Sequence, residues 1–483
     1  MPRHSVTSED EDPLTLAIAP PPNETPAERE RRIVEEKKAR EISDIIDEEI
    51  NMQRLAEKRE NPVKVLLLGQ SESGKTTTLK NFQLINSPKA FKAERASWRA
   101  VIQLNVARSI RIIIDAMTKA SSSSPESPGS LDDLSIPDSE NELPTLTAEH
   151  LKLKMRLSPL LQVEESLWRR LSPSTAVNFE TSLTSITNIP HFTQPAEVYV
   201  QSSMAWKSTF SRLVSTSTRR SGESDTDIDF DDPKDPGVIL NNCAEDMIKL
   251  WHDPTIRDLL SALKIRLEDM PGFFLDDLER ITALRYVPSD DDILKARLKT
   301  MGVSEHRFVL KTEGNMVSRD WRVFDVGGAR SLRAAWAPFF EFIDAIIFLA
   351  PLSCFDQSLV EDPSVNRLED SILLWRSIVS NRLLQKTELI LFLNKCDILR
   401  AKLESGIQFS KWVISYGDRL NTFEGTSKYM KKKFGTIHKH NSPTARTFYC
   451  HFTSVTDIQS TFQILENVKD LIVRKSLSDS HML

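Results

Sequence analysis

The sequence lacks the marks of several protein classes, and each absence narrows what the chain can be. No stretch of its 483 residues approaches the roughly 18 apolar residues that cross a bilayer, and the start, MPRHSVTSED, lacks the apolar core of a secretory signal. The only cysteines are Cys243, Cys354, Cys396 and Cys450, too widely spaced for a metal site or a disulfide framework. We therefore expect free thiols in a reducing compartment, the cytoplasm.

The composition also lacks an excess of positive charge. A net charge of -6 at pH 7 gives no reason to expect a nucleic-acid partner. Hydrophobic residues make up 40% and charged residues 27% of the chain, as in a soluble globular protein. The length predicts about three domains of ordinary size.

The clearest motif is KVLLLGQSESGKTT at residues 64–77. The apolar run before Gly69 predicts a central parallel strand buried on both faces, and the residues after it match the phosphate-binding pattern G-x-x-x-x-G-K-[ST]. In that pattern the glycines let backbone N–H groups converge on phosphate oxygens, Lys75 reaches the terminal phosphates, and the Thr76 hydroxyl can hold Mg²⁺. The alternative is a Gly-Ser turn that matches by chance.

Two further motifs end predicted strands. In DVGG at residues 325–328, Asp325 can hold Mg²⁺ through water and a glycine N–H can approach the terminal phosphate. In NKCD at residues 394–397, Asp397 can accept two hydrogen bonds from guanine that adenine cannot donate. Leaving that carboxylate without donors would cost about 1–3 kcal/mol, which favours GTP over ATP. Together the three motifs predict guanine-nucleotide binding and argue against a P-loop ATPase or kinase.

Composition and periodicity divide the chain into segments. Short apolar runs that alternate with helical stretches predict an α/β fold, a mainly parallel sheet with helices on both faces, whose ligands bind at the carboxyl ends of the strands. The helix at 27–60 carries an isoleucine stripe that either rests on the chain's own domain or docks a partner. The predicted segments are a disordered N-terminus (1–26), an amphipathic helix (27–60), a nucleotide-binding domain in two parts (61–88 and 289–483), and an all-helical domain (89–288) with disordered inserts (119–150 and 172–236).

Several stretches together resemble the heterotrimeric G-protein α subunits. They are GQSESGKTT, ERASWRAVIQLNVARSI, DDILKARLKT, WRVFDVGGARSLRAAW and FTSVTD, and the resemblance covers residues 27–117 and 239–483. It implies a P-loop GTPase domain with a mainly parallel six-stranded sheet, interrupted by an inserted all-α helical domain. It also implies GTP/GDP and Mg²⁺ as cofactors.

The resemblance assigns roles by position. Thr76 and Thr300 would be the Mg²⁺ ligands, and Arg297 would be the catalytic arginine that neutralises charge in the transition state. Met270 stands where the family has serine, and Val455 where it usually has alanine. The positions that would contact the nucleotide are Gly69, Glu72, Ser73, Gly74, Lys75, Thr76, Thr77, Asp269, Leu294, Lys295, Ala296, Arg297, Asp325, Gly328, Asn394, Lys395, Asp397 and Val455.

The main departure is Ala329. In the family this position holds a glutamine that orients the attacking water, and alanine has no group for that task. Because Arg297 is kept, two interpretations stay open: a GTPase with slow turnover, or a GTP-loaded scaffold that no longer hydrolyses. A further alternative is that another nearby side chain orients the water.

The resemblance also implies partners: a G-protein βγ dimer, a seven-helix receptor and a downstream effector. The amphipathic stretch at 457–475 would pack on the sheet and face the receptor. The start, Met1-Pro2, carries neither a myristoylation signal nor a nearby cysteine. We therefore expect a cytoplasmic protein whose membrane contact is weak or comes through partners, and we expect the basic run at 431–433 to be a solvated loop.

Overall fold

The computed structural model describes residues 25–60, 62–122, 143–171, 199–201, 230, 235–297, 299–301, 303–310, 319–359 and 361–479. Nearly all of the predicted disordered N-terminus and most of both predicted inserts lie outside these residues, so those predictions stay untested. The chain divides into two compact units, Met1–Pro62 and Val63–Leu483.

The described residues of the first unit form one long helix, α2 (Pro26–Glu60). Thr25 and Glu28 cap its start, since Glu28 accepts from the Thr25 backbone N–H at 2.9 Å while its own N–H donates to the Thr25 hydroxyl at 3.4 Å. Ile42, Ile45, Ile46 and Ile50 are between 40% and 64% exposed. Within this unit the predicted stripe is therefore uncovered.

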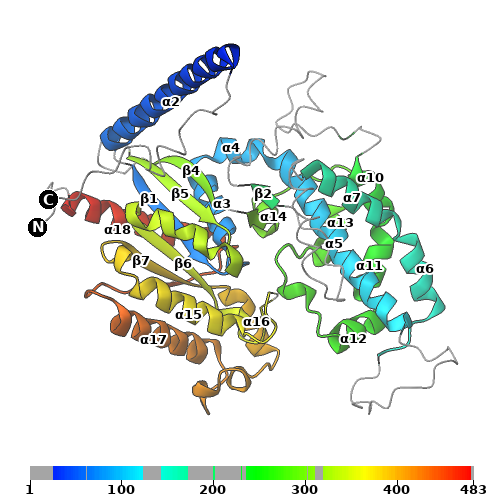
Figure 1. Ribbon diagram of the computed structural model, residues 1–483. Coiled ribbons are helices and arrows are strands. Elements are labelled where there is room, and N and C mark those ends of the chain that lie inside the picture. The colour runs from blue at the N-terminus through cyan, green and yellow to red at the C-terminus, as the bar shows by residue number, and fades with distance from the viewer. Residues whose placement is uncertain are drawn as a thin grey trace, which may run out of the picture. The chain divides into compact units, whose positions relative to one another are not determined.

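The second unit is built on a six-stranded sheet (Figure 1). Its order is β4-β5-β1-β6-β7-β8; β4 is antiparallel to β5 and every other pair is parallel. The prediction of a mainly parallel six-stranded sheet is confirmed. The strands are β1 (Val63–Gly69), β4 (Val303–Leu310), β5 (Arg319–Val326), β6 (Ala345–Pro351), β7 (Glu388–Asn394) and β8 (Tyr449–Phe452).

The central strand β1 shows why its sequence is apolar throughout. Val65 and Leu67 point into one hydrophobic core, which α3 (Lys75–Asn86) and α18 (Ile458–Asp479) cover. Leu66 and Leu68 point into a second core under α15 (Arg367–Ser380) and α17 (Phe423–Asn441), on the opposite face of the sheet (Figure 1). Each alternate side chain is therefore buried, as in parallel sheets with two helical layers.

The edge strand β4 was not foreseen, because it carries no apolar run. Ser304, His306 and Phe308 are buried, while Glu305 and Arg307 between them are exposed. This alternation is typical of an edge strand with one solvated face.

A helical block lies between α3 and the rest of the sheet in the sequence. It packs around α5 (Arg95–Ser122), whose Trp98 and Ile102 are fully buried. The buried Arg99 of α5 forms an ion pair of 2.8 Å with the buried Asp235. Its other elements are α4 (Pro88–Ala93), α6 (Ala148–Arg156), α7 (Pro159–Leu171), α10 (Pro236–Asn242), α11 (Ala244–His252), α12 (Pro254–Ala262), η2 (Leu267–Asp269), η3 (Leu275–Asp277), α13 (Leu278–Ile281) and α14 (Asp290–Lys295).

The basic run at residues 431–433 lies on α17. The predicted loop at this position is therefore wrong, although the side chains are exposed to solvent as expected. No helix among the described residues is both long and apolar enough to cross a bilayer. The remaining elements are the parallel pair β2 (Tyr199–Gln201) and β3 (Lys299–Met301), α16 (Cys396–Glu404), η4 (Arg330–Phe342), η5 (Leu352–Cys354), η6 (Arg382–Leu384), η7 (Phe409–Lys411) and η8 (Ile414–Tyr416).

Candidate functional site

A cavity of about 430 Å³ opens where strands β1, β5, β7 and β8 end. Segments that follow these strands line it, together with the segment around Asp269 and the end of α14. Ligands of open α/β sheets bind at this edge. Of the predicted site residues, those that line the cavity are Glu72, Ser73, Gly74, Lys75, Thr76, Thr77, Asp269, Leu294, Lys295, Ala296, Arg297, Gly328, Asn394, Lys395, Asp397 and Val455.

The phosphate loop, residues 69–76, needs glycine where it bends. Gly74 has φ +103° and caps α3, and a Cβ there would lie 2.4 Å from the Asn394 side-chain nitrogen. The buried Lys75 ammonium donates to the carbonyl oxygens of Gly69 at 2.9 Å and of Gln70 at 2.6 Å. Burial lowers the pKa of Lys75 to about 8, against the opposing effect of Asp325. The Lys75 ammonium therefore bonds to the backbone of the loop that precedes it. Gly69 does not line the cavity, and its carbonyl oxygen is one of the two acceptors of these bonds.

Thr76 and Asp325 form the polar corner of the site. The Thr76 hydroxyl donates to an Asp325 carboxylate oxygen at 2.8 Å, and Asp325 is 1% exposed. Among the described residues no group of three or more His, Cys, Asp or Glu could hold a metal, so an ion here would depend on few protein oxygens. A hydroxyl beside a carboxylate suits Mg²⁺, which takes oxygen ligands and keeps several waters. The side chain of Thr300 lies outside the part of the chain that is described.

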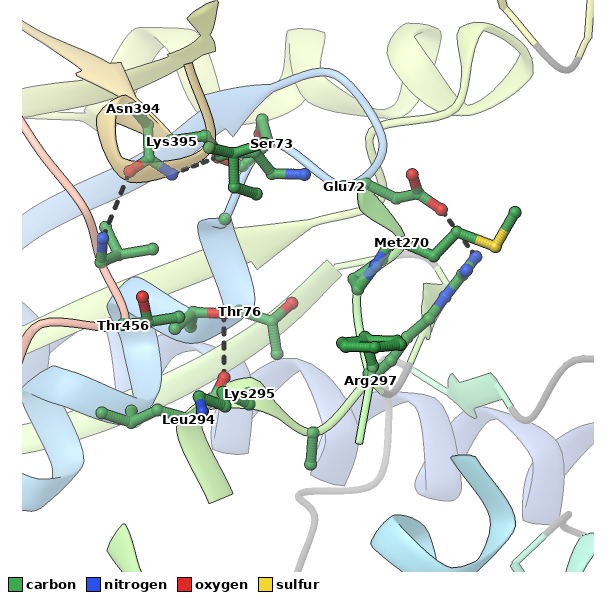
Figure 2. Close-up of a pocket in the computed structure, with 18 of the residues that line it drawn as sticks. Glu72, Ser73, Thr76, Met270, Leu294, Lys295, Arg297, Asn394, Lys395 and Thr456 are labelled. Carbon is green, nitrogen blue, oxygen red and sulfur yellow. Dashed lines mark hydrogen bonds and ion pairs between the residues drawn. The ribbon is translucent and has the colours of Figure 1, made fainter. Parts of the chain in front are cut away.

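Arg297 is held from two directions. Its guanidinium pairs with a Glu72 carboxylate oxygen at 2.8 Å (Figure 2). Its backbone N–H donates to the Asn105 side chain at 2.8 Å, and its carbonyl accepts from Asn105 at 3.2 Å. Burial alone would raise the pKa of Glu72, but the charges of Arg297, Arg367 and Lys395 outweigh it and lower that pKa to about 2. Glu72 is therefore a charged anchor for Arg297.

Lys80 supports the segment before Arg297 and was not foreseen from the sequence. Its ammonium donates to the carbonyl oxygens of Ile293 at 2.7 Å and Ala296 at 2.8 Å, and lies 4.1 Å from the Trp98 ring centre. Burial lowers its pKa to about 7. A lysine on an amphipathic helix gives no signal of such a role.

At the far end of the cavity, Asn394 connects three loops by hydrogen bonds. Its side-chain nitrogen donates to the Ser73 carbonyl at 2.7 Å (Figure 2), and its oxygen accepts from the Thr453 hydroxyl at 3.0 Å and the Val455 N–H at 3.3 Å. Asn81 adds a bond of 2.8 Å to the Val455 carbonyl. Three loops are therefore fixed to one another around the cavity. Among the lining residues that the motifs did not predict, Ile398, Ser454 and Thr456 follow strands β7 and β8.

The helical block contributes Asp269, which an ion pair of 2.7 Å joins to the buried Lys402. Lys402 also contacts Asp356 at 2.7 Å. Met270, the residue after Asp269, lines the cavity and is 39% exposed. Ala329 lines the cavity too, next to Gly328, and brings no polar side chain to it.

The chain is similar to known proteins over most of its length. The family described as "G-protein alpha subunit" matches residues 40–472. A relative named guanine nucleotide-binding protein alpha-4 subunit, from Mycosarcoma maydis, is 30% identical over 96% of this chain and 94% of its own length. The alpha-1 subunit of the same organism is 28% identical over 93% of this chain and 98% of its own. The alpha-1 subunit of Saccharomyces cerevisiae is 28% identical over 90% and 94%.

Proposed function

This chain belongs to the G-protein alpha subunit family, and from that premise we propose that it binds GTP and GDP with Mg²⁺ and hydrolyses GTP slowly. The family consists of guanine nucleotide-binding signal transducers with GTPase activity. What is specific to this chain is the residue set around its cavity, and the proposal concerns how that set handles the nucleotide.

The nucleotide would lie along the cavity with its phosphates on the loop and its base at Asn394. Backbone N–H groups at the start of α3 and the Lys75 ammonium favour phosphate. The Asp397 carboxylate, which lines the cavity, accepts from guanine. Val455 would offer to the guanine oxygen the N–H that now donates to the Asn394 side-chain oxygen at 3.3 Å, and the bond from Asn81 to the Val455 carbonyl keeps its loop in place.

Mg²⁺ would be held at Thr76 and Asp325, with Thr300 as the further ligand. The side-by-side hydroxyl and carboxylate, 2.8 Å apart, support this assignment. When bound, the ion neutralises charge on the phosphate oxygens. Asp325 also keeps the Thr76 hydroxyl oriented.

The proposal of slow turnover depends on one observation: Arg297 and Ala329 both line the same cavity. Arg297 would stabilise negative charge that develops in phosphoryl transfer, a role that family members fill with an arginine in cis. Orientation of the attacking water needs a donor and an acceptor, and Ala329 supplies neither. The chain would therefore stabilise the charge without placing the nucleophile.

A single-turnover assay with γ-labelled GTP tests this. We expect slow release of phosphate by the wild type and an increase of roughly 10²-fold in Ala329→Gln, the lower end of what a positioned proton-transfer group contributes. The matched control is Ala334→Gln, the same substitution at an exposed site of η4 that does not line the cavity. A wild-type rate equal to that of ordinary family members, unchanged by Ala329→Gln, would mean that another side chain orients the water.

The second candidate is a GTP-loaded scaffold without turnover, and the same alanine favours it. The nucleotide that co-purifies with the protein separates the two functions. Bound GDP indicates a slow enzyme, whereas bound GTP that persists in the presence of Mg²⁺ indicates a scaffold.

The proposed partners are a G-protein βγ dimer at α2, a seven-helix receptor at α18 and an effector, which would bring a cytoplasmic protein to the inner face of the plasma membrane. The exposed isoleucines of α2 support the first. On α18, Leu465 and Val468 are buried while Phe462 is 44% exposed. We expect Ile46→Asp to abolish co-purification with βγ, and Arg40→Asp, about 120° from Ile46 around the helix, to preserve it. Equal retention of both variants would contradict the docking role.

A further inference from the structure

Gln70 is a phosphate-loop residue whose side chain is turned into the protein. It is 1% exposed. Its amide nitrogen donates to the carbonyl oxygen of Arg367 at 2.8 Å and to the carboxylate of Asp370, both in the first turn of α15. Its amide oxygen has no hydrogen-bond partner among the described residues. The side chain is therefore used as a donor toward α15.

Asp370 is shared between Gln70 and a second element. Asp370 is 4% exposed. Its carboxylate accepts hydrogen bonds from the two terminal guanidinium nitrogens of Arg333, at 3.1 Å and 2.5 Å. Burial alone would raise the pKa of Asp370, but the hydrogen bonds from Arg333 and Gln70 and the charge of Arg333 lower it. A charged carboxylate in this position needs several donors, and the phosphate loop supplies one of them.

Arg333 belongs to the second-switch segment, which we define as residues 325–342. It stands four residues after Ala329, within η4. The backbone of the same segment touches the loop directly, because a Cβ on Gly328 would lie 2.3 Å from the Gln70 carbonyl carbon and 2.4 Å from the Ser71 nitrogen. Side-chain and backbone contacts thus join the loop and the segment at one place.

Helix α15 is fixed to the loop by a second side chain. Arg367 donates to the Ser71 carbonyl at 2.9 Å and pairs with Glu72 at 3.2 Å. The first turn of α15 cannot move away from the loop without breaking these bonds and those of Gln70. Asp370 is therefore a fixed point against which Arg333 is held.

We propose that Gln70 is a positioning residue that couples the phosphate loop to the second-switch segment through Asp370. A residue that only filled space would not need its amide, since an apolar side chain of the same length would pack equally well. The donor orients the carboxylate, and the carboxylate holds Arg333. The purpose of this link rests on the proposed nucleotide switch, but the link itself can be tested without nucleotide.

The test is the rate at which trypsin cuts after Arg330 in the full chain, without nucleotide and with saturating GDP or the slowly hydrolysed analogue GTPγS. Gln70→Met keeps the length of the side chain and removes the donor. We expect trypsin to cut this variant about tenfold faster than the wild type, because the substitution removes the hydrogen bond from Gln70 to the charged Asp370 carboxylate. The control is Gln83→Met in α3, the same substitution at a half-buried glutamine for which no contact with Asp370 is found in the described part of the chain. Equal rates for the two variants would overturn the proposal.

A double-mutant cycle separates the specific link from general loosening. Arg333→Leu should also speed cleavage after Arg330, and adding Gln70→Met to it should change the rate little, because both act through one carboxylate. Multiplicative effects would overturn the proposal. If Gln70→Met does not fold, Asp370→Asn must show the same acceleration, and an unchanged rate in that variant refutes the link. Nucleotide stoichiometry on the same samples reports separately on the proposed function.

Discussion

Asn394 offers the sharpest test of how the cavity is assembled, because one fully buried side chain joins three loops. Asn394→Ala would leave the Ser73 carbonyl, the Thr453 hydroxyl and the Val455 N–H without the partners they have at 2.7, 3.0 and 3.3 Å. Each lost bond costs about 1 kcal/mol, so the site loses about 3 kcal/mol. If the loops must be joined to bind nucleotide, the affinity for GDP falls by about a hundredfold.

The assay is a titration of the purified chain with GDP, paired with urea unfolding. The control is Asn421→Ala. That side chain also bridges two backbone groups, accepting from the Phe409 N–H at 2.9 Å and donating to the Ile407 carbonyl at 3.0 Å, but it does not line the cavity. We expect it to lower the free energy of unfolding by about 2 kcal/mol and to leave GDP affinity unchanged. Equal GDP affinities for the two variants would refute the reasoning.

Three further predictions follow from single contacts. Gly328→Ala places a Cβ 2.3 Å from the Gln70 carbonyl carbon, so the second-switch segment should separate from the phosphate loop and trypsin should cut after Arg330 faster than in the wild type; an equal rate contradicts this. Burial lowers the pKa of His306 to about 4, so the unfolded state binds the extra proton between pH 6.5 and 4 and stability falls as pH drops through this window. Between pH 7 and 5 His306 contributes a loss of about 2 kcal/mol by urea unfolding, and the loss should be smaller by that amount in His306→Gln, while the part due to His438 and His451, whose pKa burial also lowers, remains. Asp235→Asn leaves the buried Arg99 charge unpaired and should cost about 3–5 kcal/mol in the same assay; a loss under 1 kcal/mol contradicts it.

The parts of the fold that the sequence predicts are those in which burial is continuous. Strands β1, β6 and β7 are covered on both faces, so apolar runs mark them. The edge strand β4 was missed because its polar residues, such as Glu305, interrupt any run. The charge of the basic run on α17 predicts a solvated loop, whereas the buried Met430 and Phe434 on either side of it have the spacing of one helix face.

The site divides in the same way. Motif residues such as Lys75 and Asp397 are predictable because their chemistry requires fixed spacing along the chain. The residues that hold them in place act across long separations: Asn81 contacts Val455 across 374 positions, and Asn105 contacts Arg297 across 192. A single sequence contains no periodicity that records such contacts. Gln70 stands inside the motif, yet its spacing alone says nothing of its bond to α15.

The contacts of Arg297 indicate which step of the cycle this chain can regulate. Its guanidinium depends on Glu72 of the phosphate loop, and its backbone depends on Asn105 of the helical block. If Arg297 stabilises charge as proposed above, both attachments would contribute to its position, one at the guanidinium and one at the backbone. Ala329 contributes no competing constraint. It follows that a partner that loosens α5 would lower turnover through Arg297 even with GTP bound, and that Asn105→Ala should reduce the single-turnover rate more than it reduces GTP affinity. A parallel fall in both quantities would show that Asn105 supports binding rather than Arg297.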